Sequence, residues 1–337
     1  MASRAGVSLA TVSQVMRGTG RISPATRARV ENAASALNYV PDTRAASMRS
    51  GENRELGMVL HGLANPFNAE VVSGATDELE TRGFLLSILD SADDPARQLR
   101  NLKAFISSTR GGLLWVPAHA TEAGAVELLR AHRTPTVTFL RDPPAVPGPA
   151  TPGPAMDHLA IENEAATRAA TEHLAALGHR RIAFFGGMGD RQVRRERVEG
   201  YARAMQRLGL GAPIVWESAD AKLAGLEAML ALREAHPEVT ALVCNGDMVA
   251  IGAGLACQRL GLHAGHDVSI VGFDGTEDAA TATPALTTMS VCPREIGQSL
   301  ARMLLARIED PDAPPARIAV PARLVVRETT NPPLGGG

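Results

Sequence analysis

The sequence has few aromatic residues, no apolar run of membrane length and no recognisable cysteine pattern. Only 3% of its residues are Phe, Trp or Tyr, so Leu, Val, Ile and Ala must fill any core. No stretch approaches the roughly 20 apolar residues that a membrane span needs, and no basic start precedes an apolar run. Cys244, Cys257 and Cys292 match no metal or redox spacing. We therefore expect a reduced cytoplasmic protein without signal peptide, membrane contact, metal or cofactor.

Net charge is also small, at −2, but it is unevenly distributed. Residues 1–55 contain eight Arg and four acidic residues, so this segment carries +4 and the remainder −6. A basic head on an acidic body indicates a polyanion as the partner of the head. The length of 337 residues predicts about two or three domains.

Beyond residue 55 the pattern is typical of α/β folds, because short apolar runs alternate with amphipathic stretches. The runs cover residues 56–60, 84–89, 112–116, 136–140, 182–185, 241–244 and 268–271, and the amphipathic stretches include 69–82, 95–107, 164–177 and 248–260. Alternating strands and helices predict parallel sheets with right-handed crossovers. The Pro-rich stretch 143–154 cannot be helical, so we place a boundary between two similar doubly wound lobes near it. A ligand would bind between the lobes, outside the carboxyl ends of the strands.

The first forty residues predict helices only. Gly6 suits a tight turn, and Ser8 is a good N-cap for a helix running to about residue 17. Ser23-Pro24 then predicts the start of a third helix. In the middle helix Val12, Val15 and Met16 form the apolar face, and the outward-facing residues near its N-terminus are Leu9, Ala10, Thr11, Ser13 and Gln14. This is the arrangement of a helix-turn-helix, whose second helix enters the major groove.

Several motifs, in order and nearly throughout the chain, carry a resemblance. They are AGVSLATVSQV and GRISPATRARVENAASALNYVPD in the head, then NPF (65–67), EHLAALGHRRIAFFGG (172–187), RVEGY (197–201), DMVAIG (247–252), DVSIVGFDG (267–275) and PALTTM (284–289). Together they resemble the lactose-repressor/purine-repressor family of bacterial transcriptional regulators, and GRIS, ERVEGY and VPARL are most similar to its maltose-regulon repressor branch. Family members have several more residues ahead of Ala2, so we expect either a late start read from a valine codon or a natural truncation.

The resemblance implies which head residues contact DNA. Leu9, Ala10 and Gln14 occupy base-reading positions, where Gln14 can pair with the edge of adenine. Ser8, Thr11, Ser13 and the arginines are expected at phosphates. Residues 42–50 resemble a hinge helix that forms only on DNA, where Met48 would act as a minor-groove wedge. The hinge residues implied to contact DNA are Arg44, Ala45 and Met48.

The resemblance also implies an effector site in the cleft. Arg197 and Asp274 would bind hydroxyl or carboxylate groups, and Asn65, Phe67 and Asp90 would contribute from the first lobe. Asp220, Asn245 and Gly246 occupy further contact positions, but their residue types depart from those common in the family. We assign Met248, Ile251 and Leu255 to the core or a dimer face, and the scattered histidines, among them His61, His119, His158, His173 and His179, to the surface or to caps.

The predicted organisation is an all-α helix-turn-helix head plus an α/β periplasmic-binding-protein-like core of two doubly wound parallel-sheet lobes. The predicted ranges are 1–41 for the head, 42–54 for the hinge, 55–330 for the core and 331–337 for the tail. Within the core, the N-lobe takes about 55–156 plus 291–317 and the C-lobe about 157–290 plus 318–330.

The expected function is that of a homodimeric repressor that binds a pseudo-palindromic operator and responds to a small polar effector. No catalytic residues are assigned, because Gln192 replaces the third glycine of a dinucleotide loop and no hydrolase elbow is present. No leucine heptad follows Arg327, so a dimer is expected rather than a tetramer. A sugar-binding protein of periplasmic type and an activator of the same fold remain the alternatives. Whether the effector releases or promotes DNA binding stays open.

Overall fold

The computed structural model describes residues 1–16, 18–39, 53–108, 111–146, 156–189 and 191–334. The chain divides into two compact units, Met1–Asn53 and Arg54–Gly337. The predicted hinge residues Arg44, Ala45 and Met48 lie outside the described residues. None of the helices in the described ranges has the length and apolar character needed to cross a membrane.

The head consists of the helices α1 (Ala2–Ala5), α2 (Leu9–Met16) and α3 (Pro24–Ala36). Gly6 adopts the left-handed conformation, with φ of 59°, and turns the chain from α1 into α2, as predicted. The Ser23 hydroxyl accepts a hydrogen bond from the Thr26 amide at 3.2 Å and thereby caps α3. A small apolar core, built from all three helices, contains the buried residues Ala5, Val15, Val30 and Ala33.

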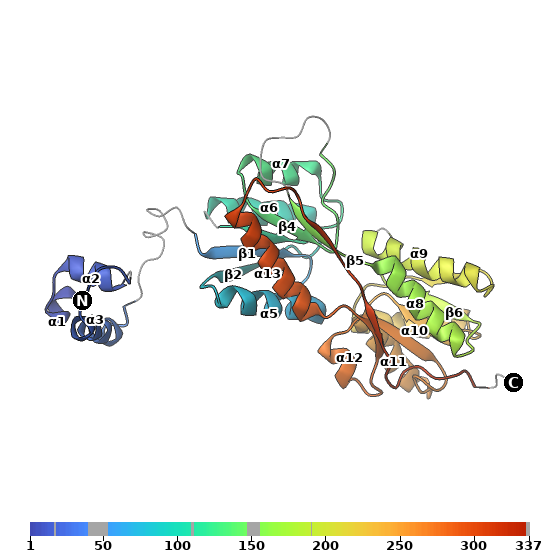
Figure 1. The fold of residues 1–337 in the computed structure, drawn as a ribbon. Helices are drawn as coiled ribbons and strands as arrows, with labels where there is room; N and C mark the ends of the chain where they lie inside the picture. Colours follow the sequence, from blue (N-terminus) through green and yellow to red (C-terminus); the bar gives the residue numbers. More distant parts are fainter. Residues whose placement is uncertain (17, 40–52, 109–110, 147–155, 190, 335–337) are drawn as a thin grey trace. The chain divides into compact units, whose positions relative to one another are not determined.

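The first lobe of the Arg54–Gly337 unit is built on a six-stranded sheet within the described residues, ordered β11-β5-β4-β3-β1-β2 (Figure 1). Its strands are β1 (Glu55–Leu60), β2 (Leu85–Asp90), β3 (Leu113–Trp115), β4 (Thr136–Phe139), β5 (Asp157–Ile161) and β11 (Arg317–Val320). Neighbouring strands pair in parallel. Helices α5 (Pro66–Glu80) and α13 (Pro293–Glu309) pack on one face, and α6 (Pro95–Ser107) and α7 (Ala123–Ala131) on the other.

The second lobe repeats this plan with the order β12-β10-β9-β8-β6-β7 within the described residues. Its strands are β6 (Ile182–Phe185), β7 (Ile214–Trp216), β8 (Ala241–Cys244), β9 (Ser269–Asp274), β10 (Thr287–Ser290) and β12 (Arg323–Val325), of which β12 is antiparallel to β10. Helices α8 (Asn163–Ala176) and α9 (Gln192–Arg207) cover one face; α10 (Lys222–Ala235) and α11 (Asp247–Arg259) cover the other, and the short α12 (Glu277–Thr281) follows β9.

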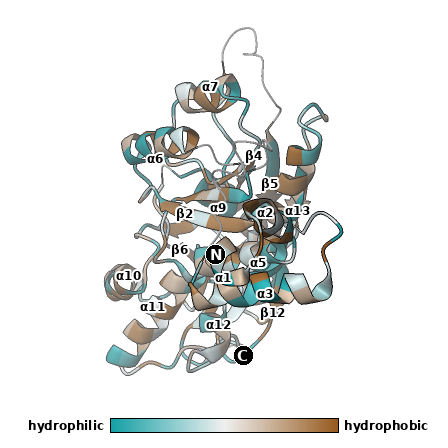
Figure 2. Cartoon of the chain, turned by 90° about the vertical axis from the view of Figure 1, so that its left-hand side faces the viewer, coloured by the Kyte–Doolittle hydropathy of each residue, from teal (hydrophilic) through white to brown (hydrophobic). Residues whose placement is uncertain are grey.

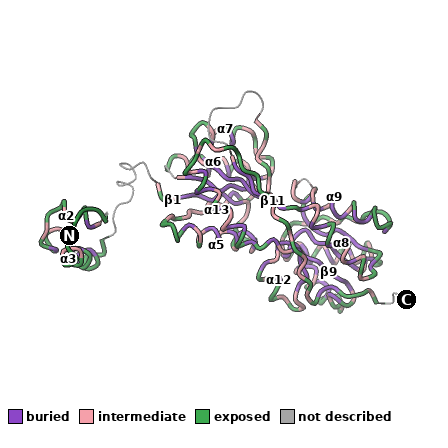
Figure 3. Tube along the Cα trace, in the orientation of Figure 1, coloured by how far each residue is buried: buried purple, intermediate pink, exposed green. Residues whose placement is uncertain are grey.

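Alternate strand residues point to opposite faces and feed separate hydrophobic clusters. In β1, Met58 packs on the α5 and α13 side, whereas Val59 packs against α6 and α7. The same alternation places Phe184 under α8 and α9 and Phe185 under α10 and α11. Figure 2 shows hydrophobic colour on strands such as β2 and mixed colour on helices such as α6, and Figure 3 shows β9 buried along its length.

The described chain passes between the lobes three times: after β5, after β10 and after β11. The predicted lobe boundary near the Pro-rich stretch is wrong, because β4 and β5, which flank that stretch, pair as neighbours in the first sheet. The predicted second-lobe starts at 157 and 318 are also displaced, since β5 and β11 both belong to the first sheet. Strand pairing, which local sequence does not reveal, decides the membership of these short strands.

Candidate DNA-binding helix and effector cleft

Helix α2 presents an exposed surface at its N-terminal end. Leu9 keeps 79% of its surface accessible, although burial would stabilise a side chain of this size. Ala10, Ser13 and Gln14 are also exposed. An apolar side chain beside an amide matches the requirements for contacting a thymine methyl and an adenine edge.

Ser8 and Thr11, also predicted to contact DNA, cap this helix. The Ser8 hydroxyl accepts a hydrogen bond from the Thr11 amide at 3.1 Å, and the two hydroxyl oxygens lie 2.9 Å apart. These bonds satisfy a backbone donor that the first turn of a helix leaves open. Ser8 is exposed and Thr11 is half-buried, so the cap holds the N-terminus of α2 in shape beside the exposed face.

A cavity of about 420 Å³ lies between the two lobes of the core. Its walls come mostly from segments that follow the carboxyl ends of strands in both sheets, where ligands bind in doubly wound folds. Of the eight predicted effector residues, six line this cavity: Asn65, Phe67, Arg197, Asp220, Asn245 and Asp274.

Asp90 and Gly246 are not among the residues lining the cavity. The carboxylate of Asp90 accepts a hydrogen bond from the Ala92 amide at 2.9 Å and lies 3.6 Å from the guanidinium of Arg97. Gly246 is the N-cap of α11, and a Cβ there would lie 2.9 Å from the carboxylate oxygens of Asp220. Gly246 therefore makes room for Asp220, which does line the cavity.

Arg197 is held on all sides inside the second lobe. Its Nε donates to Asn163 Oδ1 at 2.8 Å, and its Nη1 donates to the carbonyl of Asn245. The guanidinium carbon lies 3.4 Å from the centroid of the Phe273 ring, a cation–π contact, and Nη2 lies 3.9 Å from Asp274 Oδ1. Only 4% of the residue is exposed, so the guanidinium plane is fixed before any ligand arrives.

Asp274 ends β9 with a positive φ of 116°. The carboxylate of the fully buried Asp247 accepts hydrogen bonds from the Gly275 amide at 2.8 Å and the Thr276 amide at 2.9 Å. Burial raises the pKa of Asp274 well above its ordinary value, although the charge of Arg197 opposes the shift. Burial also raises the pKa of Asp247, to about 6. Asp247 thus positions the loop that follows Asp274 in the cavity wall.

Asp220 and Asn245 complete the acceptor groups of the second lobe. Asn245 Nδ2 donates to Asp220 Oδ2 at 3.4 Å. Asp220 is exposed toward the cleft, yet surrounding protein atoms exclude enough water to raise the pKa of its carboxyl. Burial favours the neutral form here, and the charge of Arg197 favours the ionised form less strongly.

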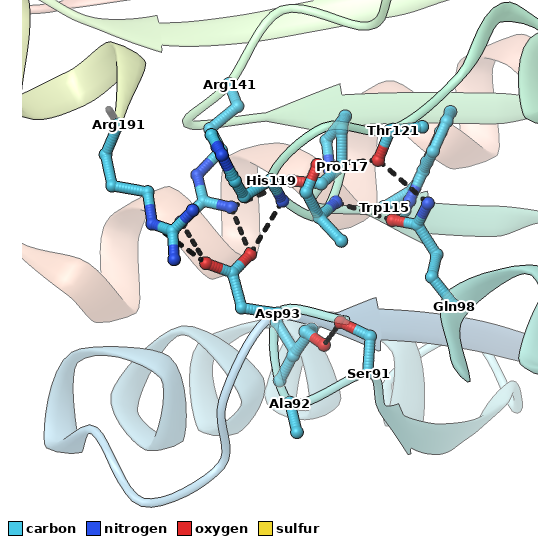
Figure 4. Close-up of polar contacts among 12 residues, drawn as sticks. Ser91, Ala92, Asp93, Gln98, Trp115, Pro117, His119, Thr121, Arg141 and Arg191 are labelled. Atoms are coloured by element: carbon cyan, nitrogen blue, oxygen red, sulfur yellow. Dashed lines mark hydrogen bonds and ion pairs between the residues drawn. The ribbon is translucent and has the colours of Figure 1, made fainter. Parts of the chain in front are cut away.

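The first lobe contributes a network centred on Asp93, which Figure 4 shows. Arg141 donates to both carboxylate oxygens of Asp93, the His119 amide donates to Oδ1 at 2.8 Å, and Arg191 of the second lobe lies 3.4 Å from Oδ2. Burial disfavours ionisation of Asp93, but the hydrogen bonds and charge of Arg141 outweigh it, so the pKa of this carboxyl is lowered. Asp93 thereby joins the two lobes at the cavity wall.

The loop behind this network is held by Gln98. Its Oε1 accepts hydrogen bonds from Trp115 Nε1 at 2.8 Å and from the Ala118 amide at 2.6 Å, while its Nε2 donates to Thr121 Oγ1 at 2.9 Å (Figure 4). A buried amide with these partners satisfied holds the 117–121 loop rigidly.

Two regions of the chain match known protein-family models. Residues 1–42 match "Bacterial regulatory proteins, lacI family", and residues 171–330 match "Periplasmic binding protein-like domain". The ribose operon repressor of Escherichia coli is 31% identical over 325 residues, which cover 96% of each chain. The chain belongs to the lacI family of bacterial regulatory proteins. It is therefore a DNA-binding transcriptional regulator with an effector-binding type of core, which confirms the family and fold predictions.

Two further relatives support the assignment along the whole chain. The maltose regulon regulatory protein MalI of Escherichia coli is 28% identical over 332 residues, with 95% of each chain covered. The crystal structure of the lac repressor dimer bound to operator and the anti-inducer ONPF superposes with a TM-score of 0.80 at 25% identity, covering 98% of this chain and 97% of that one. Together with the ribose operon repressor, these relatives align with nearly the whole chain.

Sequence reasoning missed residues of both lobes in the walls of this lacI-family cleft. His61, Asp93, Arg141 and Arg191 line the cavity, and so does Met248, which was assigned to the core or a dimer face. The motif pattern carried no signal for the Asp93 network because its members come from separate loops. A positive φ at Asp93, 57°, is visible only in the folded chain.

The assignment of the histidines to the surface or to caps is wrong for His61 and His158, whereas the backbone amide of His179 donates to the Leu174 carbonyl at the C-terminal end of α8. His158 and His179 are buried, and His61 lines the cavity. Burial lowers the pKa of His61 to about 4, and the positive charge of Arg141 adds to that shift. The imidazole is therefore neutral near pH 7 and can accept or donate a hydrogen bond according to its tautomer.

Proposed function

We propose that this chain is a repressor that binds a pseudo-palindromic operator as a homodimer in the cytoplasm, associated with the nucleoid, and that a small polar effector in the cleft changes its affinity for DNA. The alternative of a catalytic role is not favoured, since the relatives are regulators. The observation that carries the proposal is the presence, in one chain, of an exposed helix-turn-helix face and a polar cavity walled by two lobes.

On the DNA side, the proposal assigns base contacts to Leu9, Ala10 and Gln14. Support comes from their exposure at the N-terminal end of α2 and from the cap that orders this end. Ser8, Thr11 and Ser13 are assigned to phosphates, which position the head without reading sequence. A twofold dimer would present two such helices to the halves of a palindrome.

On the effector side, the proposal assigns ligand contacts to the lining residues of both lobes. A ligand that touches Arg197 and Asp274 from one side and Phe67 from the other would favour one angle between the lobes. The chain passes between the lobes three times among the described residues. A change in the angle between the lobes would therefore move each lobe as a body about these three connections. A coupling of about 1–3 kcal/mol between effector and operator is typical of such regulators.

Fluorescence anisotropy on DNA fragments from upstream of the gene and its neighbours, against a scrambled duplex at two salt concentrations, tests the proposal. We expect specific binding in the roughly 10⁻⁸ M range or tighter. Gln14→Ala should weaken it about 5–150-fold, which corresponds to about 1–3 kcal/mol for a lost bidentate pair. The exposed Asn32→Ala, on α3, is the matched control. Equal affinity for the scrambled duplex would contradict the proposal.

A further inference from the structure

Arg194, in the first turn of α9, lies in the cavity wall with part of its guanidinium unpaired. Its Nε donates to the Gly186 carbonyl at 3.0 Å, and its guanidinium carbon lies 5.8 Å from the centroid of the buried Phe184 ring. Nη1 lies 3.4 Å from Glu217, whose side chain is 54% exposed. Nη2 is buried and has no hydrogen-bond partner within the part of the chain that the structure describes.

A buried nitrogen without a hydrogen-bond partner costs free energy of folding unless a ligand binds it. Arg194 is only 6% exposed, so water does not compensate its charge freely. The ion pair with Glu217 compensates it weakly, because an exposed carboxylate is screened by solvent. The turn that precedes α9 also encloses the side chain: a Cβ on Gly187 would lie 2.8 Å from Arg194 Cδ. The chain therefore holds this cation in place rather than letting it turn outward to solvent.

The surroundings of Arg194 in the cavity are positive. It belongs to the first turn of the 16-residue helix α9, whose first turn contains no acidic residue, and the helix dipole adds positive potential there. Arg191, the N-cap residue, also lines the cavity. Four arginines line the cavity against three aspartates, and Arg141 and Arg191 share one of these, Asp93.

Two other polar atoms in the cavity wall could form hydrogen bonds with neutral groups of a ligand. Asn245 Oδ1 and His61 Nδ1 are buried and lack hydrogen-bond partners in the described part of the chain. An amide oxygen can accept a hydrogen bond from a hydroxyl group, and the aspartates of the second lobe can do the same. The cavity thus combines an unpaired cation on α9 with acceptors for hydroxyl groups.

We propose that the effector of this protein is an anionic polyol, and that Arg194 binds its oxyanion, a carboxylate or a phosphate, at the N-terminus of α9. This inference rests on the proposed function, because it names the chemical class of the ligand of that same cleft. A neutral sugar would leave the buried charge of Arg194 uncompensated, whereas an oxyanion provides both charge and paired acceptor oxygens for a guanidinium fork. Arg194 is thus a specificity-determining residue that selects acids over neutral polyols.

Thermal unfolding with simple anions tests the site without knowledge of the full effector. The melting temperature is measured at pH 7 in inorganic phosphate, in acetate and in chloride at equal ionic strength. At least one of the two oxyanions should raise Tm by about 1–3 °C over chloride, and the larger response identifies phosphate or carboxylate as the preferred group. Arg194→Gln should remove that difference, and Arg194→Lys, which keeps the charge but not the fork, should retain part of it.

Arg203→Gln is the matched control, since Arg203 is an exposed arginine on the same helix, paired with Glu199 and Glu164. It should respond to the anions as the natural protein does. Equal Tm in all three salts, or an anion response that persists in Arg194→Gln, would overturn the inference.

The two proposals fail separately. If the protein binds its operator specifically but the anion response is the same in Arg194→Gln, the proposed regulator stands and the oxyanion site is refuted. If the anion response depends on Arg194 but the protein shows no specific DNA binding, the oxyanion site stands and the proposed repressor function is refuted. Circular dichroism of Arg194→Gln and Arg194→Lys verifies that both variants fold.

Discussion

Asp142 of the first lobe and Gln192 of the second are joined by two hydrogen bonds beside the cavity. The Asp142 amide donates to Gln192 Oε1 at 3.2 Å, and Gln192 Nε2 donates to Asp142 Oδ2 at 3.0 Å. Arg317, on β11, also donates to the carboxylate of Asp142. This contact therefore connects the start of α9, where the cleft is positively charged, to a strand adjoining one of the lobe crossings.

Gln192→Ala should loosen the contact between the lobes. It removes both hydrogen bonds, each contributing about 1 kcal/mol, so local opening becomes easier. We expect amide exchange near residue 142 and at the start of α9 to accelerate about 5–30-fold, measured by hydrogen exchange with mass spectrometry. Gln206→Ala, an exposed glutamine on the same helix, should leave these rates unchanged. Unchanged exchange in Gln192→Ala would show that the pair does not hold the lobes together.

Arg197 and Asp274 should be coupled energetically. Arg197→Met leaves a buried carboxyl without its cation and is expected to cost about 3 kcal/mol of unfolding free energy. Because Asp274→Asn removes the charge that Arg197 compensates, the double variant should be at least about 1 kcal/mol more stable than the sum of the single effects predicts. Urea unfolding of the four proteins measures this coupling, and strictly additive effects would refute it.

His61 should make stability depend on pH. Its pKa is lowered from 6.5 to about 4 in the folded chain, so the folded state binds fewer protons than the unfolded state between these values. The contribution is complete above pH 6.5 and is lost as the pH falls toward 4. Between pH 7 and pH 5 the natural protein should lose about 2 kcal/mol more than His61→Gln does. Urea unfolding at both pH values measures the difference, and parallel losses would contradict the prediction.

Gly74 and Gly254 should respond oppositely to alanine. A Cβ on Gly74 in α5 would lie 2.0 Å from the Arg294 carbonyl of α13, so Gly74→Ala forces these helices apart and should cost about 1–3 kcal/mol. Gly254 in α11 has open space at this position, so Gly254→Ala should stabilise by about 0.5–1 kcal/mol through helix propensity. Thermal or urea unfolding gives both signs, and a neutral Gly74→Ala would mean that α5 and α13 can separate without cost.

The local elements were predictable from residue patterns. Apolar runs such as 56–60 and 182–185 form strands that are buried on both faces of their sheets. Such strands are continuously apolar because neither face meets water, so polar residues do not alternate along them. Gly6, Ser8 and Ser23 marked the turn and caps of the head correctly because such positions depend on neighbouring residues alone. The family resemblance likewise identified six of the residues that line the cleft.

Membership of the lobes depended on the tertiary structure. Short strands such as β5 and β11 carry the same local signal whichever sheet they join, and only strand pairing assigns both to the first lobe. The Asp93 network was equally invisible in the sequence, since Arg141 and Arg191 approach Asp93 from different lobes. Local sequence determines which segments become helices, strands and caps because these depend on neighbours along the chain. Only the packed sheets decide which distant charges meet in the cleft, because those contacts depend on how the separate segments pair.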